Sequence, residues 1–176
     1  MPTRSEIIDR LLEGLLHDAR NPLNALAINL EVLSDRLQHD SASGKPAARN
    51  VAAMKELVAR TDSLLERFVG FLSAPGPEDG TVDLSAVVLC AADLLCHEAR
   101  RRRVQVRHDV DPAVGGVAPD ARELRWKVLE LLWGSLVEAG AGAELSFDVR
   151  VERPQAVLRV TGAGPPRCLM LPLARE

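Results

Sequence analysis

The sequence predicts an α+β protein in which an antiparallel helical hairpin, forming a dimeric four-helix bundle, precedes a truncated α/β sandwich. Two long stretches with apolar residues at helical spacing come first in the 176-residue chain, a segment rich in proline and glycine follows, and shorter alternating stretches come last. Hydrophobic residues make up 47% of the chain, but aromatic residues make up only 3%. Such an aliphatic composition suits the interdigitated core of a helical bundle.

The first apolar pattern predicts one long helix from about Ser5 to Leu37. Its steps of three and four residues form a heptad seam with one extra residue near Pro22. Because proline has no N–H for the carbonyl of Asp18, we expect the helix to loosen or kink there. The seam residues are Ile8, Leu12, Leu15, Ala19, Leu23, Leu26, Leu30, Leu33 and Leu37.

A second seam predicts an antiparallel partner helix after a loop at residues 38–46. The combined apolar face is too broad for one partner helix, and a four-helix bundle of two chains would cover it. The alternative is a monomeric hairpin that packs on its own C-terminal domain. The second seam consists of Val51, Met54, Val58, Thr61, Leu65, Phe68 and Leu72, flanked by Leu57, Leu64 and Phe71.

These patterns divide the chain into a hairpin at 1–74, a linker at 75–81 and an α/β domain at 82–176. The strands after Ala143 are joined by short turns, which predicts an antiparallel sheet with helices on one face. The expected elements are a helix from Leu84 to about Arg101, a strand from Val104 to Val110, a helix from Pro119 to Glu138, and strands around Leu145–Val151, Ala156–Val160 and Cys168–Leu173.

The composition also limits the class of protein. A net charge of −3 gives no general attraction to nucleic acid. No apolar run near the N-terminus has the length of a signal peptide or a membrane span, so we expect a cytoplasmic protein without membrane contact. Three cysteines, an odd number, favour a reducing compartment. The spacing of Cys90, Cys96 and His97 does not fit a zinc site, and we expect no bound metal.

His17 is the strongest candidate for a chemical role. On a helix it lies beside Asn21, four residues on, and it points away from the seam. An exposed imidazole is a usable nucleophile at neutral pH. Asp18 can hold the imidazole proton, Asn21 can orient a phosphoryl oxygen or a water, and Arg20 can stabilise charge. The alternative is a solvated surface histidine without a chemical role.

The segment Leu15-Leu16-His17-Asp18-Ala19-Arg20-Asn21-Pro22 resembles the H-box of two-component histidine kinases. The resemblance implies that His17 is the phosphoacceptor, that Asp18 is the base, and that Asn21 assists dephosphorylation of a partner. The same helix face continues through Asn24, Ala25 and Ile28. These residues would contact the docking helix of a receiver domain, or they are simply outer residues of the bundle.

The C-terminal half is similar to the Bergerat-type ATP-binding domain of that family in the order of its elements. It lacks two polar residues by which that domain binds Mg²⁺ and adenine. Gly134 stands where the N-box asparagine would help to hold Mg²⁺, and Gly162 stands where an aspartate would bind adenine. Only fourteen residues follow Gly162, so we expect no glycine-rich lid of the family's kind. Phosphoryl transfer from ATP needs metal and positioned charge. We therefore expect a degenerate domain that does not bind ATP.

Two further features have more than one interpretation. Trp133, on one stripe with Trp126 and Leu129, either fills the vacated nucleotide pocket or makes an ordinary packing or subunit contact. The run Arg100–Arg103 is best explained as a solvated helix cap, where the helix dipole favours cations, and the alternative is contact with a partner that has an acidic face.

The resemblance to the family predicts a homodimeric histidine phosphotransferase of a bacterial phosphorelay, without a cofactor of its own. Its partners would be receiver domains of response regulators or hybrid kinases, which carry their own Mg²⁺. The rival prediction is a non-catalytic pseudo-kinase regulator that blocks a kinase or a receiver. A third is a residual kinase.

Overall fold

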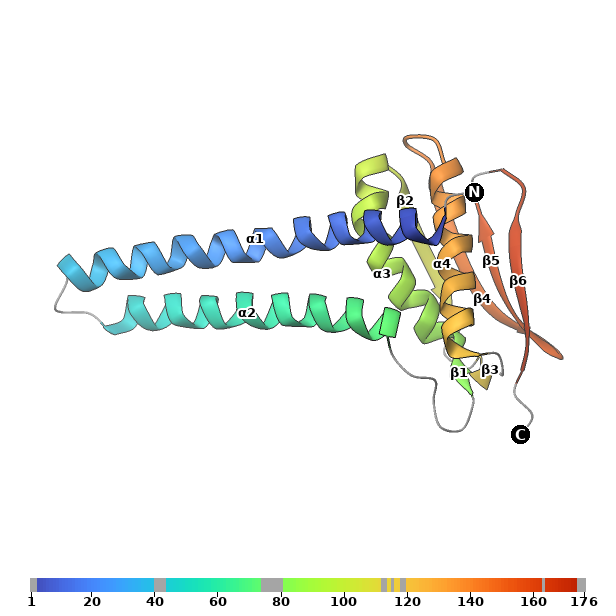
Figure 1. The fold of residues 1–176 in the computed structure, drawn as a ribbon, viewed down its shortest axis with the longest axis horizontal. Helices are drawn as coiled ribbons and strands as arrows, with labels where there is room; N and C mark the ends of the chain where they lie inside the picture. Colours follow the sequence, from blue (N-terminus) through green and yellow to red (C-terminus); the bar gives the residue numbers. More distant parts are fainter. Residues whose placement is uncertain are drawn as a thin grey trace.

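The computed structural model describes residues 3–39, 44–73, 81–111, 114, 116–117, 120–162 and 164–173. Helix α1 (Arg4–His39) and helix α2 (Gly44–Ser73) lie side by side as a long hairpin that projects from an α/β domain (Figure 1). The predicted hairpin is therefore confirmed. The helices extend further into the predicted loop than expected, since α1 ends at His39 and α2 begins at Gly44.

Pro22 lies inside α1, and its ring is buried. The helix continues past it for 17 residues to His39, so proline removes one backbone hydrogen bond without ending the helix. Burial of the apolar ring offsets part of that loss. The expected interruption of the hydrogen-bond pattern thus does not divide α1 into two elements.

The remaining elements form the α/β domain, in which helices α3 and α4 cover one face of the main sheet (Figure 1). The four-stranded sheet has the order β2-β4-β5-β6, and the two-residue strands β1 and β3 pair separately. The elements are β1 (Val82–Asp83), α3 (Leu84–Arg102), β2 (Gln105–Val110), β3 (Gly116–Val117), α4 (Ala121–Glu138), β4 (Glu144–Glu152), β5 (Gln155–Thr161) and β6 (Arg167–Pro172).

The antiparallel sheet expected after Ala143 is correct for β4, β5 and β6, but β2 runs parallel to β4. A parallel neighbour follows from the connection, because α4 carries the chain back across the sheet between β2 and β4. In β4 the buried residues alternate as predicted. Strand β2 is an exposed edge despite its alternating sequence.

Aspartate side chains cap the N-termini of α3 and α4, the two helices of the α/β domain. Asp83 accepts a hydrogen bond from the backbone N–H of Ala86 at 3.1 Å, and Asp120 accepts one from Glu123 at 2.9 Å. Each satisfies a donor that the first helical turn leaves without a partner. Helix α4 therefore begins at Ala121, slightly after the predicted start at Pro119, a residue outside the described ranges.

The base of the hairpin shares one hydrophobic core with the α/β domain. Ile7 and Leu11 of α1 and Phe68 and Phe71 of α2 are buried in the same cluster as residues of α3 and α4. Burying each such side chain contributes about 1.5–3 kcal/mol. The hairpin thus packs on its own domain at the base, while its distal part extends beyond the domain (Figure 1).

Part of the arginine run serves a buried carboxylate. The Glu98 side chain is only 5% exposed and accepts hydrogen bonds from Arg101 and Arg102 at 2.6 Å each. Arg103 ends α3 in the left-handed conformation, with a φ of 57°. These residues are therefore not a purely solvated cap, because two of the guanidinium groups compensate a buried charge.

No helix in the described part of the chain combines the length and apolarity needed to cross a membrane.

We predict that Glu98→Gln destabilises the fold at neutral pH by about 1–3 kcal/mol. Burial of Glu98 opposes ionisation, but the hydrogen bonds from Arg101 and Arg102 outweigh it and hold its pKa below the usual value. A depressed folded-state pKa adds stability above the unfolded-state pKa, and that stability is lost as the pH falls through the folded-state pKa. Urea unfolding of both proteins, repeated from neutral to acidic pH, would show the difference shrinking; a constant difference would contradict the prediction.

Candidate functional site

His17 lies on the outer surface of α1, with its side chain 61% exposed. Its Nδ1 lies 3.2 Å from Oδ1 of Asp18. An ionised carboxylate only accepts hydrogen bonds, so the proton of a neutral His17 ring lies on Nδ1 and the lone pair on Nε2. In this tautomer Nε2 bears the lone pair that a nucleophilic role of His17 would require.

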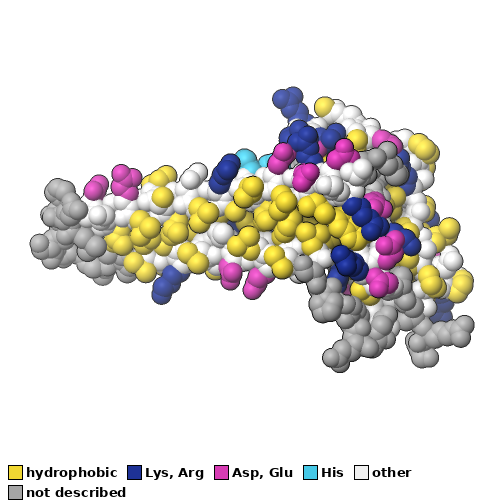
Figure 2. Space-filling view, in the orientation of Figure 1, with side chains coloured by type: hydrophobic (Ala, Val, Ile, Leu, Met, Phe, Trp, Pro, Cys, Tyr) yellow, Lys and Arg dark blue, Asp and Glu magenta, His cyan; other side chains and the backbone are white. Residues whose placement is uncertain are grey.

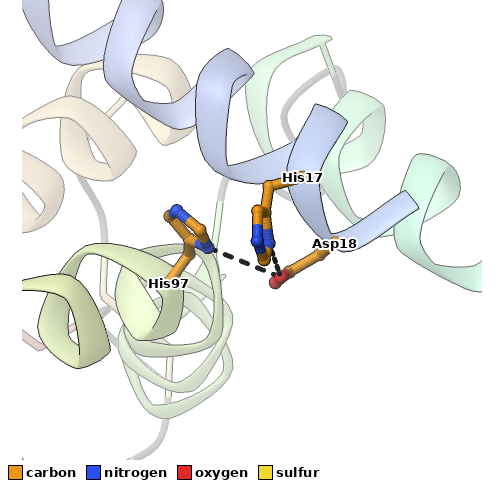
Figure 3. Close-up of side chains that lie close together, drawn as sticks. All are labelled: His17, Asp18 and His97. Atoms are coloured by element: carbon orange, nitrogen blue, oxygen red, sulfur yellow. Dashed lines mark hydrogen bonds and ion pairs between the residues drawn. The ribbon is translucent and has the colours of Figure 1, made fainter. Parts of the chain in front are cut away.

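Asp18 joins two groups of α3 to this histidine. Its Oδ1 also lies 3.5 Å from Nδ1 of His97, and its Oδ2 accepts a hydrogen bond from Arg100 at 3.1 Å. The two imidazole rings lie 4.6 Å apart between centroids and are tilted by 50°. Figure 3 shows both rings directed toward the same carboxylate, one from α1 and one from α3.

The pKa of Asp18 is lowered from its usual value. Partial burial opposes ionisation, but the hydrogen bond from His17 and the charge of Arg100 outweigh that effect. Asp18 is therefore a carboxylate at neutral pH, which accepts a hydrogen bond from His17 and lies within ion-pair distance of His97.

A glycine in α1 makes room for the second histidine. A Cβ at Gly14 would lie 3.1 Å from Cβ of His97 and 3.3 Å from two of its ring atoms. Gly14 precedes His17 by three residues, so both positions face α3 on adjacent turns. The absence of a side chain at Gly14 therefore lets α3 approach closely enough for His97 to reach Asp18.

Two adjoining clefts beside Asp18 are lined by more cationic than anionic side chains. The first, of about 220 Å³, is lined by Arg60, Arg67, His97 and Arg100, by the carboxylates of Asp18 and Asp93, and by apolar residues of α1, α2 and α3. The second is lined by Asp18, Asn21, Pro22, Ala25, Leu57, Arg60, Leu64 and Arg100. Arg67 pairs with Asp93 and Arg100 pairs with Asp18, so part of this positive charge is compensated.

The structure places the other candidate residues on the same helix with different surroundings. Asn21 is exposed and lines the second cleft, whereas the cation in contact with Asp18 is Arg100 rather than Arg20. Asn24 is exposed, Ala25 is half-buried, and Ile28 is 60% exposed. Their role in partner binding stays a prediction.

His97 and Arg100 contact Asp18, but no pattern in the sequence predicts them as site residues. Both lie in the last turns of α3, about eighty positions from His17, and no local motif connects them with the H-box. The only sequence signal is their spacing of three residues on one helix face, next to an arginine run that a helix cap already explains. The close approach of α1 and α3 was needed to find them.

The positions that depart from the ATP-binding pattern are occupied in other ways. A Cβ at Gly134 would meet the guanidinium of Arg167, which pairs with Glu138. Gly162 has a φ of +115°, and a Cβ there would overlap the carbonyl oxygen of Glu144. The backbone around Gly162 therefore has no space for an aspartate side chain.

The two tryptophans differ in environment. Trp133 is only 3% exposed, and its Nε1 has no hydrogen-bond partner in the described structure. Trp126 is half-buried beneath the guanidinium of Arg4, 5.3 Å from the ring centroid, so it contacts the base of the hairpin. Whether Trp133 replaces a nucleotide stays a hypothesis.

Gly14→Ala and Gly70→Ala form a matched pair that tests the close approach. Both glycines lie inside helices, but an added Cβ at Gly70 meets nothing within 4 Å. Helix propensity alone favours each alanine by about 0.5–1 kcal/mol. We predict that Gly70→Ala gains this stability in urea unfolding and that Gly14→Ala gains less or loses, because His97 must move. Equal gains would show that the contact at Gly14 is not tight.

No protein-family model matches the chain, and no curated protein matches it significantly. Similarity is found among solved structures, at low identity. The catalytic domain of histidine kinase ThkA matches with 14% identity and a TM-score of 0.45, and the match covers 49% of this chain and 60% of that one. The chain thus spans less than two thirds of that domain.

Two longer matches include the hairpin. Histidine kinase AdeS of Acinetobacter baumannii has 18% identity and a TM-score of 0.43 over 85% of this chain and 73% of that one. A bacterial phosphotransferase has 12% identity and a TM-score of 0.42 over 91% of this chain and 68% of that one. The similar structures thus include histidine kinase domains, the family whose H-box the segment around His17 resembles.

Proposed function

We propose that this chain is a histidine phosphotransferase of two-component signalling, which moves phosphoryl groups between receiver-domain aspartates through phospho-His17. The main support for this proposal is the exposed His17 imidazole. Its Nδ1 lies 3.2 Å from Oδ1 of Asp18, which leaves the lone pair of the ring on Nε2. Its H-box sequence supports the same role. The partners would be receiver domains of response regulators or hybrid kinases.

The transfer balances without a nucleotide. Nε2 of His17 attacks the phosphorus of an aspartyl phosphate, a P–N bond forms, the P–O bond to the carboxyl breaks, and the receiver aspartate leaves as a carboxylate. Asp18 stabilises the Nδ1 proton as the ring gains positive charge. In the reverse direction a second receiver's carboxylate attacks the phosphorus and releases His17. The Mg²⁺ that neutralises the phosphoryl oxygens would belong to the receiver.

The surroundings of His17 fit an incoming phosphoryl group. Arg100 and Arg60 line the cleft beside Asp18 and Asn21, and both guanidinium groups can contact anionic oxygens. Arg100 already holds Oδ2 of Asp18, so it stands beside the carboxylate that orients His17. We propose that Asn21 positions a phosphoryl oxygen or water and that Asn24, Ala25 and Ile28 contact the receiver.

A route through ATP is disfavoured by the surroundings of two glycines. Gly162 has no space for an adenine-binding aspartate, and the position beside Gly134 holds the Arg167 guanidinium. Phosphoryl transfer from ATP needs residues that hold Mg²⁺ and the phosphates. We therefore propose that the second domain supports the hairpin and docking rather than nucleotide chemistry. Autophosphorylation with labelled ATP would reveal a residual kinase.

We also propose that the active form is a homodimer. Leu16, Leu23 and Leu30 of α1, and Val51, Val58 and Leu65 of α2, are exposed, and each set repeats every seven residues. Figure 2 shows hydrophobic side chains gathered along the hairpin. A heptad position that stays uncovered on both helices is typical of a bundle seam without its partner helices.

The same exposed heptad residues also support a second candidate function. If the exposed heptad residues bind the helices of a kinase rather than a second copy, the chain would be a regulator that needs no phosphohistidine. His17→Ala separates the two functions, because a regulator would keep its inhibitory effect whereas a phosphotransferase would lose all activity.

We predict that the wild-type protein, mixed with phosphorylated receiver domains, acquires phosphate that is labile to acid and stable to alkali. His17→Ala should abolish this labelling because it removes the accepting nitrogen. His108→Ala is the matched control, since His108 lies on the exposed edge strand β2 and should leave labelling unchanged. Labelling that survives in His17→Ala, or that is absent from wild-type protein with a broad set of receivers, would refute the proposal.

The proposed dimer can be tested separately by placing a charge in its seam. Val58→Glu places a charge in the proposed seam and should weaken dimerisation at least ~10-fold, because the carboxylate would lose water on burial. Ser63→Glu, an exposed position on the same helix but away from the stripe, is the control. Sedimentation equilibrium of the three proteins measures the effect. A monomeric wild type, or equal dimerisation of all three, would contradict it.

A further inference from the structure

We infer that His17, Asp18 and His97 form a binding site for a divalent transition metal of the zinc class, shared between the hairpin and α3. The three residues each offer a ligand atom, and these atoms lie within 4.8 Å of one another. Two imidazoles and one carboxylate are ligands that zinc, cobalt and nickel accept, whereas magnesium and calcium prefer oxygen.

The distances from the Asp18 carboxylate to the two rings fit the edges of a coordination tetrahedron. Two ligands about 2.0–2.1 Å from a tetrahedral zinc lie roughly 3.3–3.4 Å apart. Oδ1 of Asp18 lies 3.2 Å from Nδ1 of His17 and 3.5 Å from Nδ1 of His97. A metal could therefore replace the hydrogen bonds between these atoms with small movements of the rings. In Figure 3 both rings approach one carboxylate from different helices, as this requires.

The surroundings support an open site of moderate affinity. Arg100 holds Oδ2 of Asp18 and fixes the carboxylate with Oδ1 toward the two rings, which is the kind of contact that orients a metal ligand. The same positive charge opposes a cation, so we expect micromolar rather than nanomolar affinity. Because the His17 side chain is largely exposed, water can supply the remaining ligands.

The two ligand histidines are far apart in the sequence, which explains why spacing gave no indication of a metal site. His17 comes from α1 and His97 from α3, and they meet because Gly14 leaves space for His97. The site thus depends on the contact between the two parts of the chain. A bound metal would link α1 to α3 and stabilise this contact.

Metal binding and phosphoryl transfer would need opposite forms of His17. A metal on Nδ1 takes the lone pair of that atom, so the proton of the neutral ring moves to Nε2 and Nε2 loses its nucleophilic lone pair. The metal-bound ring therefore cannot accept a phosphoryl group at Nε2. This consequence rests on the proposed function, whereas the metal site itself does not.

Titration of the full chain with Co²⁺ and Zn²⁺ tests the site without any receiver. We expect micromolar binding by calorimetry, a visible Co²⁺ absorption spectrum that Zn²⁺ abolishes, and a Tm higher by a few degrees with Zn²⁺. His97→Gln should weaken binding at least ~10-fold, whereas His108→Gln and Cys96→Ser should bind like the wild type. Circular dichroism of each variant establishes that it is folded.

Two outcomes would overturn the inference: wild-type protein that does not bind either ion at micromolar concentration, or a folded His97→Gln variant that binds like wild type. Loss of binding in Cys96→Ser would also overturn it, by assigning the metal to the neighbouring thiol. Failure of phosphoryl transfer would leave these measurements unaffected. Where transfer is observed, we expect Zn²⁺ to slow it in the wild type and to have a weaker effect in His97→Gln.

Discussion

The close approach of α1 to α3 at Gly14 determines what surrounds His17, the proposed phosphoacceptor. Without a side chain at Gly14, His97 lies against α1, and its ring and Arg100 both reach Asp18. The carboxylate that orients His17 is thereby held by two groups from the second domain. The surroundings of His17 thus depend on the packing of the α/β domain, although the segment that resembles an H-box lies entirely within one helix.

Periodicity made the helices and most strands predictable, because amphipathic patterns report directly on which face is buried. The heptad seams indicated α1 and α2, and alternation indicated β4. The parallel pairing of β2 with β4 could not be obtained in this way, since it depends on the path of the chain across the sheet. The two-residue strands β1 and β3 are too short to carry a pattern.

For the site, sequence reasoning identified His17 and Asp18, which are adjacent in the chain and share a local motif. It did not identify His97 or Arg100, because their contribution arises from contact between helices that are far apart in sequence. The arginine run was harder still to interpret, since its members act separately. Arg100 contacts Asp18, Arg101 and Arg102 compensate Glu98, and Arg103 ends the helix.

The backbone at Gly162 has a consequence for how this domain could change. Both its positive φ and the nearby Glu144 carbonyl forbid a Cβ, so replacing this glycine with aspartate would displace the β4–β5 pairing before it could create a purine contact. A single base change that replaces this glycine would therefore disturb the sheet. Position 162 could carry a side chain only after the main chain around it had been rebuilt.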